Sequence, residues 1–160
     1  MKVVVLMPPD GIGSNLRAIR ATGVEVVAVL TESTKDLRSY APDYVCLTGW
    51  KKIIPDEVIN NYKVLNIHPG LIPDTINGTV LCPDGTLGLW NRGLYQKKAI
   101  QNFLDKKATY AGSSLHYMTH EFDFGPVLGR VFEKIRPDDT VESLYTRLKV
   151  KENQLWARVF

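Results

Sequence analysis

The stretch KVVVLMPPDGIGSNLRAI, residues 2–19, decides the fold class. It begins with an almost unbroken apolar run, Lys2–Met7, which two prolines end. Such a run is typical of a strand buried on both faces of a parallel sheet. A glycine turn follows, and Ser14 or Asn15 is a good residue with which to begin a helix. The stretch therefore predicts the first strand, turn and helix of an α/β fold.

The same alternation of apolar runs and helix signals continues along the chain. Further strands are predicted at Val24–Leu30, Asp43–Thr48, Lys63–Ile67, Ser113–Met118 and Val127–Ile135. Helices are predicted after Pro55, over Leu89–Lys107 and after the capping-box pattern Asp139-Thr140-Val141-Glu142. Polar and turn-forming residues predict irregular structure over Thr31–Ser39 and Pro69–Gly88. This order predicts a Rossmann-like α/β fold, with a mainly parallel sheet flanked by helices, in one domain over residues 1–160.

Composition narrows the class of protein. The chain has 44% apolar and 23% charged residues, as soluble globular proteins do. A net charge of +3 provides no argument for nucleic acid, and the lysine pairs are interpreted as solvated helix faces. The apolar start is too short for a signal sequence, and no stretch approaches the length of a membrane span. We therefore expect a cytoplasmic protein with small-molecule substrates, either a monomer or a homodimer.

Two cysteines, Cys46 and Cys82, complete this picture. A single disulfide between them stays an open possibility, but two cysteines form neither a disulfide framework nor a metal-binding spacing. A reducing cytoplasm fits them best.

Ligands of parallel α/β sheets bind beyond the carboxyl ends of the strands. The turn Gly11–Asn15 lies at such an end and is either a tight turn or an anion site at a helix N-terminus. It contains two of the three glycines of a dinucleotide fingerprint, but Leu16 occupies the third position. Glu32 stands near the place of the ribose-binding acid of that fingerprint, so the dinucleotide interpretation stays open but weak.

Two further groups of polar residues favour catalysis. Asn66 and His68 lie two apart at the end of a predicted strand, so their side chains share one face. Asparagine donates hydrogen bonds, and histidine moves protons near neutral pH. Two histidines and two acids crowd His116–Pro126 without the spacing of a metal site, so no metal is expected. The Asp-x-Gly-Pro turn there holds the carboxylate of Asp123 in a fixed place, as a pair with His68 requires.

Four motifs resemble the folate-dependent formyltransferases. Residues 66–73 resemble the N-x-H-P-S-L-L-P signature, and residues 115–128 resemble the V-H-x-V strand that leads to D-x-G-P. Residues 41–54 are similar to the family's A-P-D strand and glycine turn. Residues 13–16 resemble the G-S-N-L phosphate loop of the enzymes that act on glycinamide ribonucleotide. The motifs follow the family's order and cover nearly the whole chain.

The resemblance implies a formyltransferase fold and the transfer of a formyl group from 10-formyltetrahydrofolate to the amine of glycinamide ribonucleotide, in purine biosynthesis. By the same resemblance, Asn66 and a protonated His68 bind the reaction's oxyanion, and Asp123 sustains the charge on His68. The resemblance also implies that the substrate phosphate binds at Gly11, Gly13, Ser14 and Asn15, and that Glu152 contacts the ribose. It further implies that the pterin pocket is lined by Trp50, Lys51, Ile53, Thr119, His120, Glu121 and Phe122.

Three features depart from the family pattern. The segment Thr31–Ala41 is short, Thr79–Gly88 is an insertion, and Gly70 replaces the common serine. Three alternatives therefore stay open. The chain is a formyltransferase for another amine, such as an amino-sugar nucleotide, or a formyl-folate hydrolase, or a non-catalytic Rossmann-like nucleotide-binding domain.

Overall fold

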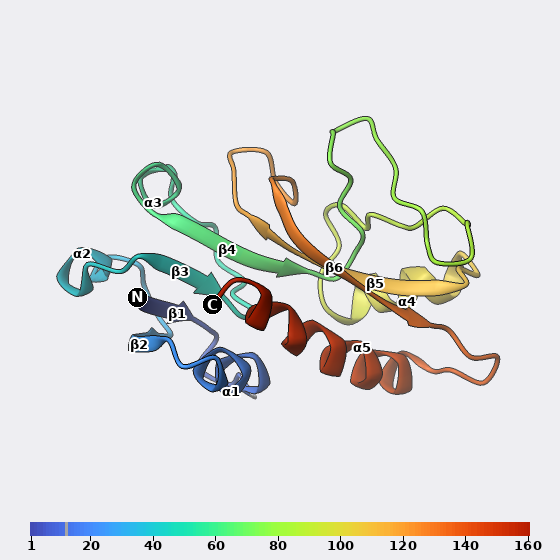
Figure 1. The fold of residues 1–160 in the computed structure, drawn as a ribbon, viewed down its shortest axis with the longest axis horizontal. Helices are drawn as coiled ribbons and strands as arrows, with labels where there is room; N and C mark the ends of the chain where they lie inside the picture. Colours follow the sequence, from blue (N-terminus) through green and yellow to red (C-terminus); the bar gives the residue numbers. More distant parts are fainter. Residues whose placement is uncertain (12) are drawn as a thin grey trace.

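The computed structural model describes residues 1–11 and 13–160. Six strands form one sheet in the order β2-β1-β3-β4-β5-β6 (Figure 1). The strands are β1 Lys2–Leu6, β2 Glu25–Leu30, β3 Tyr44–Leu47, β4 Lys63–His68, β5 Tyr110–Tyr117 and β6 Val127–Lys134. The pairs among β1 to β4 are parallel, whereas β5 and β6 pair antiparallel. The predicted α/β fold with a mainly parallel sheet is confirmed.

Helices cover both faces of this sheet. They are α1 Ser14–Ala21, α2 Leu37–Tyr40, α3 Asp56–Asn61, α4 Lys97–Asp105 and α5 Val141–Leu155, followed by the 3-10 turn η1 Trp156–Arg158. Successive side chains of a strand point to opposite faces. Val3 and Val5 accordingly pack in the cluster that α1, α4 and α5 cover, whereas Val4 and Leu6 pack with α2 and α3. This burial on both faces explains why the first apolar run is unbroken.

The helix predicted over Leu89–Lys107 is wrong in its first half. The structure has a helix only over α4, where Ile100 and Phe103 are buried as the apolar spacing required. Before it, Asn91, Gly93 and Gln96 have φ angles of 56°, 82° and 50°. These left-handed conformations cannot continue a right-handed helix. The chain from residue 89 to residue 96 is therefore an irregular connection that contains turns and is not part of a helix.

The start of α5 lies one residue later than the predicted capping box. Thr140 is the N-cap, and its hydroxyl accepts from the backbone N of Ser143 at 3.2 Å. Ser143 Oγ accepts in turn from the backbone N of Thr140 at 2.9 Å. Asp139, the expected cap, instead accepts from Arg147 Nη1 at 2.6 Å, because the guanidinium attracts its carboxylate more strongly.

Two other expectations receive a definite answer. The segment Thr31–Ser39, expected to be irregular, leads into the single turn of α2. Cys46 and Cys82 are both buried free thiols, so the open possibility of a disulfide is wrong. Within the described residues, the structure contains no helix with the length and apolar character that a membrane span requires.

The sheet order determines where the candidate site lies. Because β1, β3 and β4 run parallel, their carboxyl ends meet at one edge of the sheet. The turn that leads to α1 follows β1, and His68 ends β4. The long loop after β4 extends outward beyond the sheet before the chain reaches α4 (Figure 1).

Candidate active site

The structure brings His68 and Asp123 together. His68 is the last residue of β4, and its side chain is 2% exposed. Asp123 comes from the loop between β5 and β6, and its Oδ1 lies 3.5 Å from Nδ1 of His68. The two residues are 55 positions apart in the sequence and meet because β4 pairs with β5. The carboxylate of Asp123 is 25% exposed, so it is the member of the pair that faces outward.

The hydrogen bonds of His68 assign its ring protons. Nε2 lies 2.7 Å from the carbonyl oxygen of Trp90. Because a carbonyl only accepts, Nε2 carries a proton, and Nδ1 is the nitrogen that faces Asp123.

The burial of His68 opposes the protonated state that the resemblance implied. Burial lowers the pKa of His68 below its ordinary value, and Asp123 raises it by less. The ring nevertheless lies 3.5 Å from a carboxylate, which stabilises an imidazolium once a proton arrives.

Asn66 lies two residues before His68 and is half-buried. Its Nδ2 lies 3.4 Å from Nε2 of His116, whose Nδ1 donates to the carbonyl of Tyr117 at 3.0 Å. Burial, followed by the nearby ring of His68, lowers the pKa of His116 to about 4. A neutral His116 thus accepts from Asn66 and fixes which way its amide points. Among residues 1–11 and 13–160, no other hydrogen bond forms to this amide, so its second N–H can donate to a ligand.

The predicted phosphate loop lies at the start of α1. Gly13 is the N-cap and has a φ of 79°, a conformation that glycine adopts readily. Gly11 and Ser14 flank the turn and are half-buried. Asn15 has a structural task, because its buried Oδ1 accepts from the indole N–H of Trp156 at 3.0 Å. The first N–H groups of a helix have no partner within it, so this turn offers donors of the kind that bind a phosphate.

Glu152 lies on α5 and is 4% exposed. Its Oε1 accepts from Ser113 Oγ at 2.5 Å, and Lys149 Nζ lies 2.8 Å from its Oε2. Its charge also raises the pKa of His68, so it lies within electrostatic reach of the catalytic pair. The acid predicted to contact the ribose is therefore near the site, but at present it is paired with Lys149.

The residues predicted to line the pterin pocket form two neighbouring segments. Thr119, His120, Glu121 and Phe122 belong to the loop that carries Asp123, and Trp50, Lys51 and Ile53 precede α3. His120 ties its loop to α3, the helix that follows the second segment, because its ring nitrogens bond Asp56 at 3.2 Å and Asn60 at 2.8 Å. The Thr119 hydroxyl braces the loop from within by donating to the carbonyl of Phe124 at 2.6 Å.

These segments present both apolar surface and one unused donor. Ile53 is 93% exposed and Phe122 is 62% exposed, which is unusual for large apolar side chains. The ring of Trp50 packs against the core that α2 and α3 cover, and its buried Nε1 has no hydrogen-bond partner among the described residues. Exposed apolar side chains beside a polar loop suit a ligand with a flat ring.

Sequence analysis missed Trp90, whose carbonyl bonds His68. The residue was placed in a helix, which would have pointed its carbonyl along the helix axis. One signal did exist. Gly70 stands where the family has serine, and a Cβ at this position would lie 1.9 Å from the oxygen of Trp90. The glycine is therefore the place where the backbone of Trp90 approaches the site.

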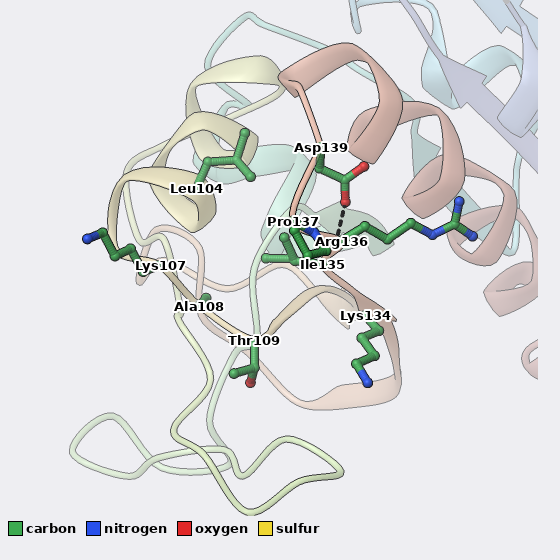
Figure 2. A pocket seen from close by; sticks show the side chains of 9 residues that line it. All are labelled: Leu104, Lys107, Ala108, Thr109, Lys134, Ile135, Arg136, Pro137 and Asp139. Carbon is green, nitrogen blue, oxygen red and sulfur yellow. Dashed lines mark hydrogen bonds between the residues drawn. The ribbon is translucent and has the colours of Figure 1, made fainter.

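A hollow of about 480 Å³ lies away from these residues, between the end of α4, the end of β6 and the loop that follows (Figure 2). None of the predicted site residues lines it. Its basic side chains, Lys107, Lys134 and Arg136, point away from one another and do not converge on a common ligand (Figure 2). Over residues 1–11 and 13–160, no three His, Cys, Asp or Glu side chains are placed to hold a metal ion.

Comparisons with known proteins show which family the chain belongs to. The chain is 31% identical over 125 residues to the chloroplastic phosphoribosylglycinamide formyltransferase of Arabidopsis thaliana, which covers 77% of the chain and 38% of that protein. It is 26% identical over 131 residues to phosphoribosylglycinamide formyltransferase of Escherichia coli, which covers 80% of the chain and 52% of that protein. The chain thus matches about half the length, or less, of these two relatives.

A solved structure and a family model extend the comparison. The crystal structure of phosphoribosylglycinamide formyltransferase from Anaplasma phagocytophilum is similar with a TM-score of 0.75 and 26% identity, over 96% of this chain and 82% of that one. The family model described as formyl transferase matches residues 23–160. The chain therefore belongs to the formyl transferase family.

Proposed function

We propose that this protein transfers the formyl group of 10-formyltetrahydrofolate to the amine of glycinamide ribonucleotide. The observation that carries the proposal is the approach of His68 Nδ1 to Asp123 Oδ1, at 3.5 Å, beside Asn66 at the end of β4. Relatives in plants and bacteria that are named for this reaction support the choice of acceptor. The G-S-N-L turn before α1 supports it as well, because it suits a phosphate.

The reaction makes one bond and breaks one. The lone pair of the amine nitrogen forms a bond to the formyl carbon, and the bond between that carbon and the donor nitrogen breaks. The amine loses one proton and the donor nitrogen gains one, so the overall transfer consumes no acid or base. Between these two events the formyl oxygen carries negative charge, and a proton needs a temporary acceptor.

The three residues divide these tasks. Asn66 keeps one N–H available, which donates to the formyl oxygen as charge develops there. Asp123 is the exposed member of the pair, so it meets the amine and takes up its proton. Nδ1 of His68 is unprotonated at neutral pH and shares that proton, because the imidazolium so formed lies beside the carboxylate. A low resting pKa of His68 therefore suits a residue that must first accept a proton.

The residues around the pair fit both substrates. Ile53 and Phe122 supply exposed apolar surface for the pterin ring, and 10-formyltetrahydrofolate supplies the formyl group there. The carboxyl ends of β1 and β4 are two strands apart, or about 10 Å at about 4.8 Å per strand. A phosphate at Gly13 thus reaches the catalytic pair through one ribose and a short amide.

A formyl-transfer assay tests the proposal. The purified chain, with 10-formyltetrahydrofolate, is given glycinamide ribonucleotide, an amino-sugar nucleotide, or no amine, and deformylated folate is followed by absorbance. Transfer to glycinamide ribonucleotide is the expected result. Transfer only to the amino-sugar nucleotide contradicts the acceptor, and equal turnover without an amine identifies a hydrolase.

Substitutions test the assigned residues. Asn66→Ala, His68→Ala and Asp123→Asn should each lower kcat by about 10²–10³, the usual cost of losing one such group. The losses should not add, since the residues act as a unit. The control is Asn61→Ala, which removes an exposed amide on α3 and should leave kcat unchanged. A His68→Ala enzyme with wild-type kcat contradicts the catalytic assignment but not the family.

A further inference from the structure

Residues Trp90–Gly93, here called the strap, lie beside His68 and Asp123 in the irregular connection before α4. The strap lies where the sequence predicted a helix. It contacts both members of the catalytic pair. The carbonyl of Trp90 accepts from His68 Nε2 at 2.7 Å, and the backbone N of Gly93 donates to Asp123 Oδ2 at 2.7 Å. The other oxygen of Asp123, Oδ1, is thereby directed toward His68.

Asp123 needs such support because its backbone is strained. Its φ is 51°, in the left-handed region that residues with a Cβ adopt only at a cost. The two peptide groups on either side of its Cα define φ and ψ. A carboxylate on a strained residue keeps its position only when both of these peptide groups are held.

Two side chains of the strap hold these two peptide groups. Arg92 Nε donates to the carbonyl of Phe122, in the peptide group before the Cα of Asp123, at 3.1 Å. The indole N–H of Trp90 donates to the carbonyl of Asp123 itself, in the peptide group after it, at 2.8 Å. The strap therefore fixes both φ and ψ of Asp123 through side chains that bond its backbone and not its carboxylate.

Arg92 is itself held firmly. Its guanidinium lies 4.8 Å from the ring centre of Trp90, in the strap, and 4.4 Å from that of Phe122, in the Asp123 loop. Arg92 therefore contacts an aromatic ring on each of these two segments. Its Nη2 also bonds Glu121 Oε2 at 3.2 Å. A planar guanidinium that stacks on rings and donates in fixed directions cannot be replaced by lysine without losing these contacts.

We propose that Arg92 and Trp90 are positioning residues, which hold Asp123 in its left-handed conformation and so keep its carboxylate on His68. This inference rests on the proposed function of the Asp123–His68 pair in proton transfer. Misplacing a catalytic group by about 1 Å costs on the order of 10²-fold in rate. Loss of Arg92 therefore lowers kcat by about 10- to 10²-fold and leaves the KM for both substrates nearly unchanged.

A double-mutant cycle separates positioning from a merely structural role. Arg92→Met keeps an unbranched apolar side chain and removes the donors. In an otherwise wild-type enzyme it should lower kcat by about 10- to 10²-fold, whereas in an Asp123→Asn enzyme it should have almost no further effect. Equal losses in both backgrounds would show that Arg92 acts independently of Asp123 and would overturn the proposal. So would a kcat within twofold of wild type in Arg92→Met alone.

Two further variants sharpen the test. Trp90→Phe keeps an aromatic ring but removes the N–H that bonds the carbonyl of Asp123, and it should reproduce the loss in kcat. Arg130→Met is the matched control, since Arg130 also bonds a carbonyl and a carboxylate, those of Ile72 and Asp74, and it should keep wild-type kcat. A loss of equal size in this control would mean that the assay reports general loosening of the fold.

An NMR measurement needs no turnover and so distinguishes failure of this inference from failure of the proposed function. The Nε2 proton of His68 is buried and bonded to the Trp90 carbonyl, so it should exchange slowly with water and give a resolved signal. The signal should broaden or disappear in Arg92→Met and persist in Arg130→Met. An unchanged signal in both variants overturns the inference even if the enzyme transfers formyl groups. A changed signal in Arg92→Met, with no formyl transfer by the wild-type chain, leaves the strap correct and the proposed reaction wrong.

Discussion

The substitution Gly70→Ala asks whether the backbone of Trp90 lies against the catalytic histidine. A Cβ at residue 70 would lie 1.9 Å from the oxygen of Trp90, 2.7 Å from its carbonyl carbon and 2.8 Å from Nε2 of His68. Carbon and oxygen atoms in close contact normally stay about 3.3 Å apart, so the Trp90 carbonyl must retreat by about 1.4 Å. Backbone and a buried ring both block the new methyl group, so rotation of a side chain cannot relieve the clash.

The magnitude follows from two losses. A retreat of about 1.4 Å breaks the hydrogen bond between His68 and Trp90, now 2.7 Å long, and such a bond contributes about 1 kcal/mol. Overpacking lowers the free energy of unfolding by about 1–3 kcal/mol more. Alanine also makes the unfolded chain stiffer than glycine does, which raises the free energy of unfolding by about 0.4–1 kcal/mol. We expect the free energy of unfolding to fall by about 2 kcal/mol. For a domain of this size that corresponds to a loss of about 4–8 °C in Tm.

Thermal unfolding followed by circular dichroism measures this change, and the formyl-transfer assay should show a lower kcat in the same variant. Gly78→Ala is the control, because its Cβ would chiefly meet the end of the Thr75 side chain, which can rotate away. A Gly70→Ala protein with the Tm of the wild type would refute the placement of the strap. Equal losses of Tm in both variants would show that the change reports glycine replacement in this loop in general.

Three further predictions concern stability and the acceptor site. Burial lowers the pKa of His116 from 6.5 to about 4. Between these two pH values the unfolded chain binds a proton at His116 and the folded chain does not. The free energy of unfolding should therefore fall by about 3 kcal/mol between about pH 7 and pH 4. Denaturant titrations across this range measure it, and a flat profile would contradict a buried neutral His116. Asp139→Ala should cost about 3 kcal/mol in the same titrations, because it leaves Arg147 without bonds of 2.6 and 2.7 Å, whereas exposed Asp138→Ala should cost less than about 0.5 kcal/mol. Gly13→Val should raise the KM for the acceptor by about tenfold, since a β-branched residue resists a φ of 79°, and equal damage to the KM of the formyl donor would make the turn merely structural.

The strands could be predicted because burial on both faces leaves an unbroken apolar run in the sequence. Lys2–Leu6 and Tyr44–Leu47 lie in the middle of the sheet, and both were found within a residue or two of their true bounds. The helix over Leu89–Lys107 failed in its first half for a physical reason. Apolar spacing detects which side chains face a core, but it does not detect the positive φ angles of Asn91 and Gln96. The side chain of Asn91 is held by a tertiary hydrogen bond to the carbonyl of Pro69, which the spacing does not reveal either.

The site divides in the same way. Asn66, His68 and Asp123 could be selected from the sequence because their side chains are of the types that the proposed chemistry needs, and the structure places His68 and Asp123 in contact. The charge on His68 could not be predicted, because burial and a nearby carboxylate act in opposite directions, and only the structure shows which is larger. The role of Trp90 was equally out of reach, since a backbone carbonyl is present at every residue and leaves no mark in the sequence.

Gly70 connects these two kinds of residue. A serine at this position, as in the family signature, would place its Cβ where the Trp90 carbonyl now lies. The loss of a side chain at residue 70 therefore makes room for the strap, and the strap in turn supplies hydrogen bonds to both His68 and Asp123. Restoring the serine alone should damage the site, because the strap that requires the glycine would still be present.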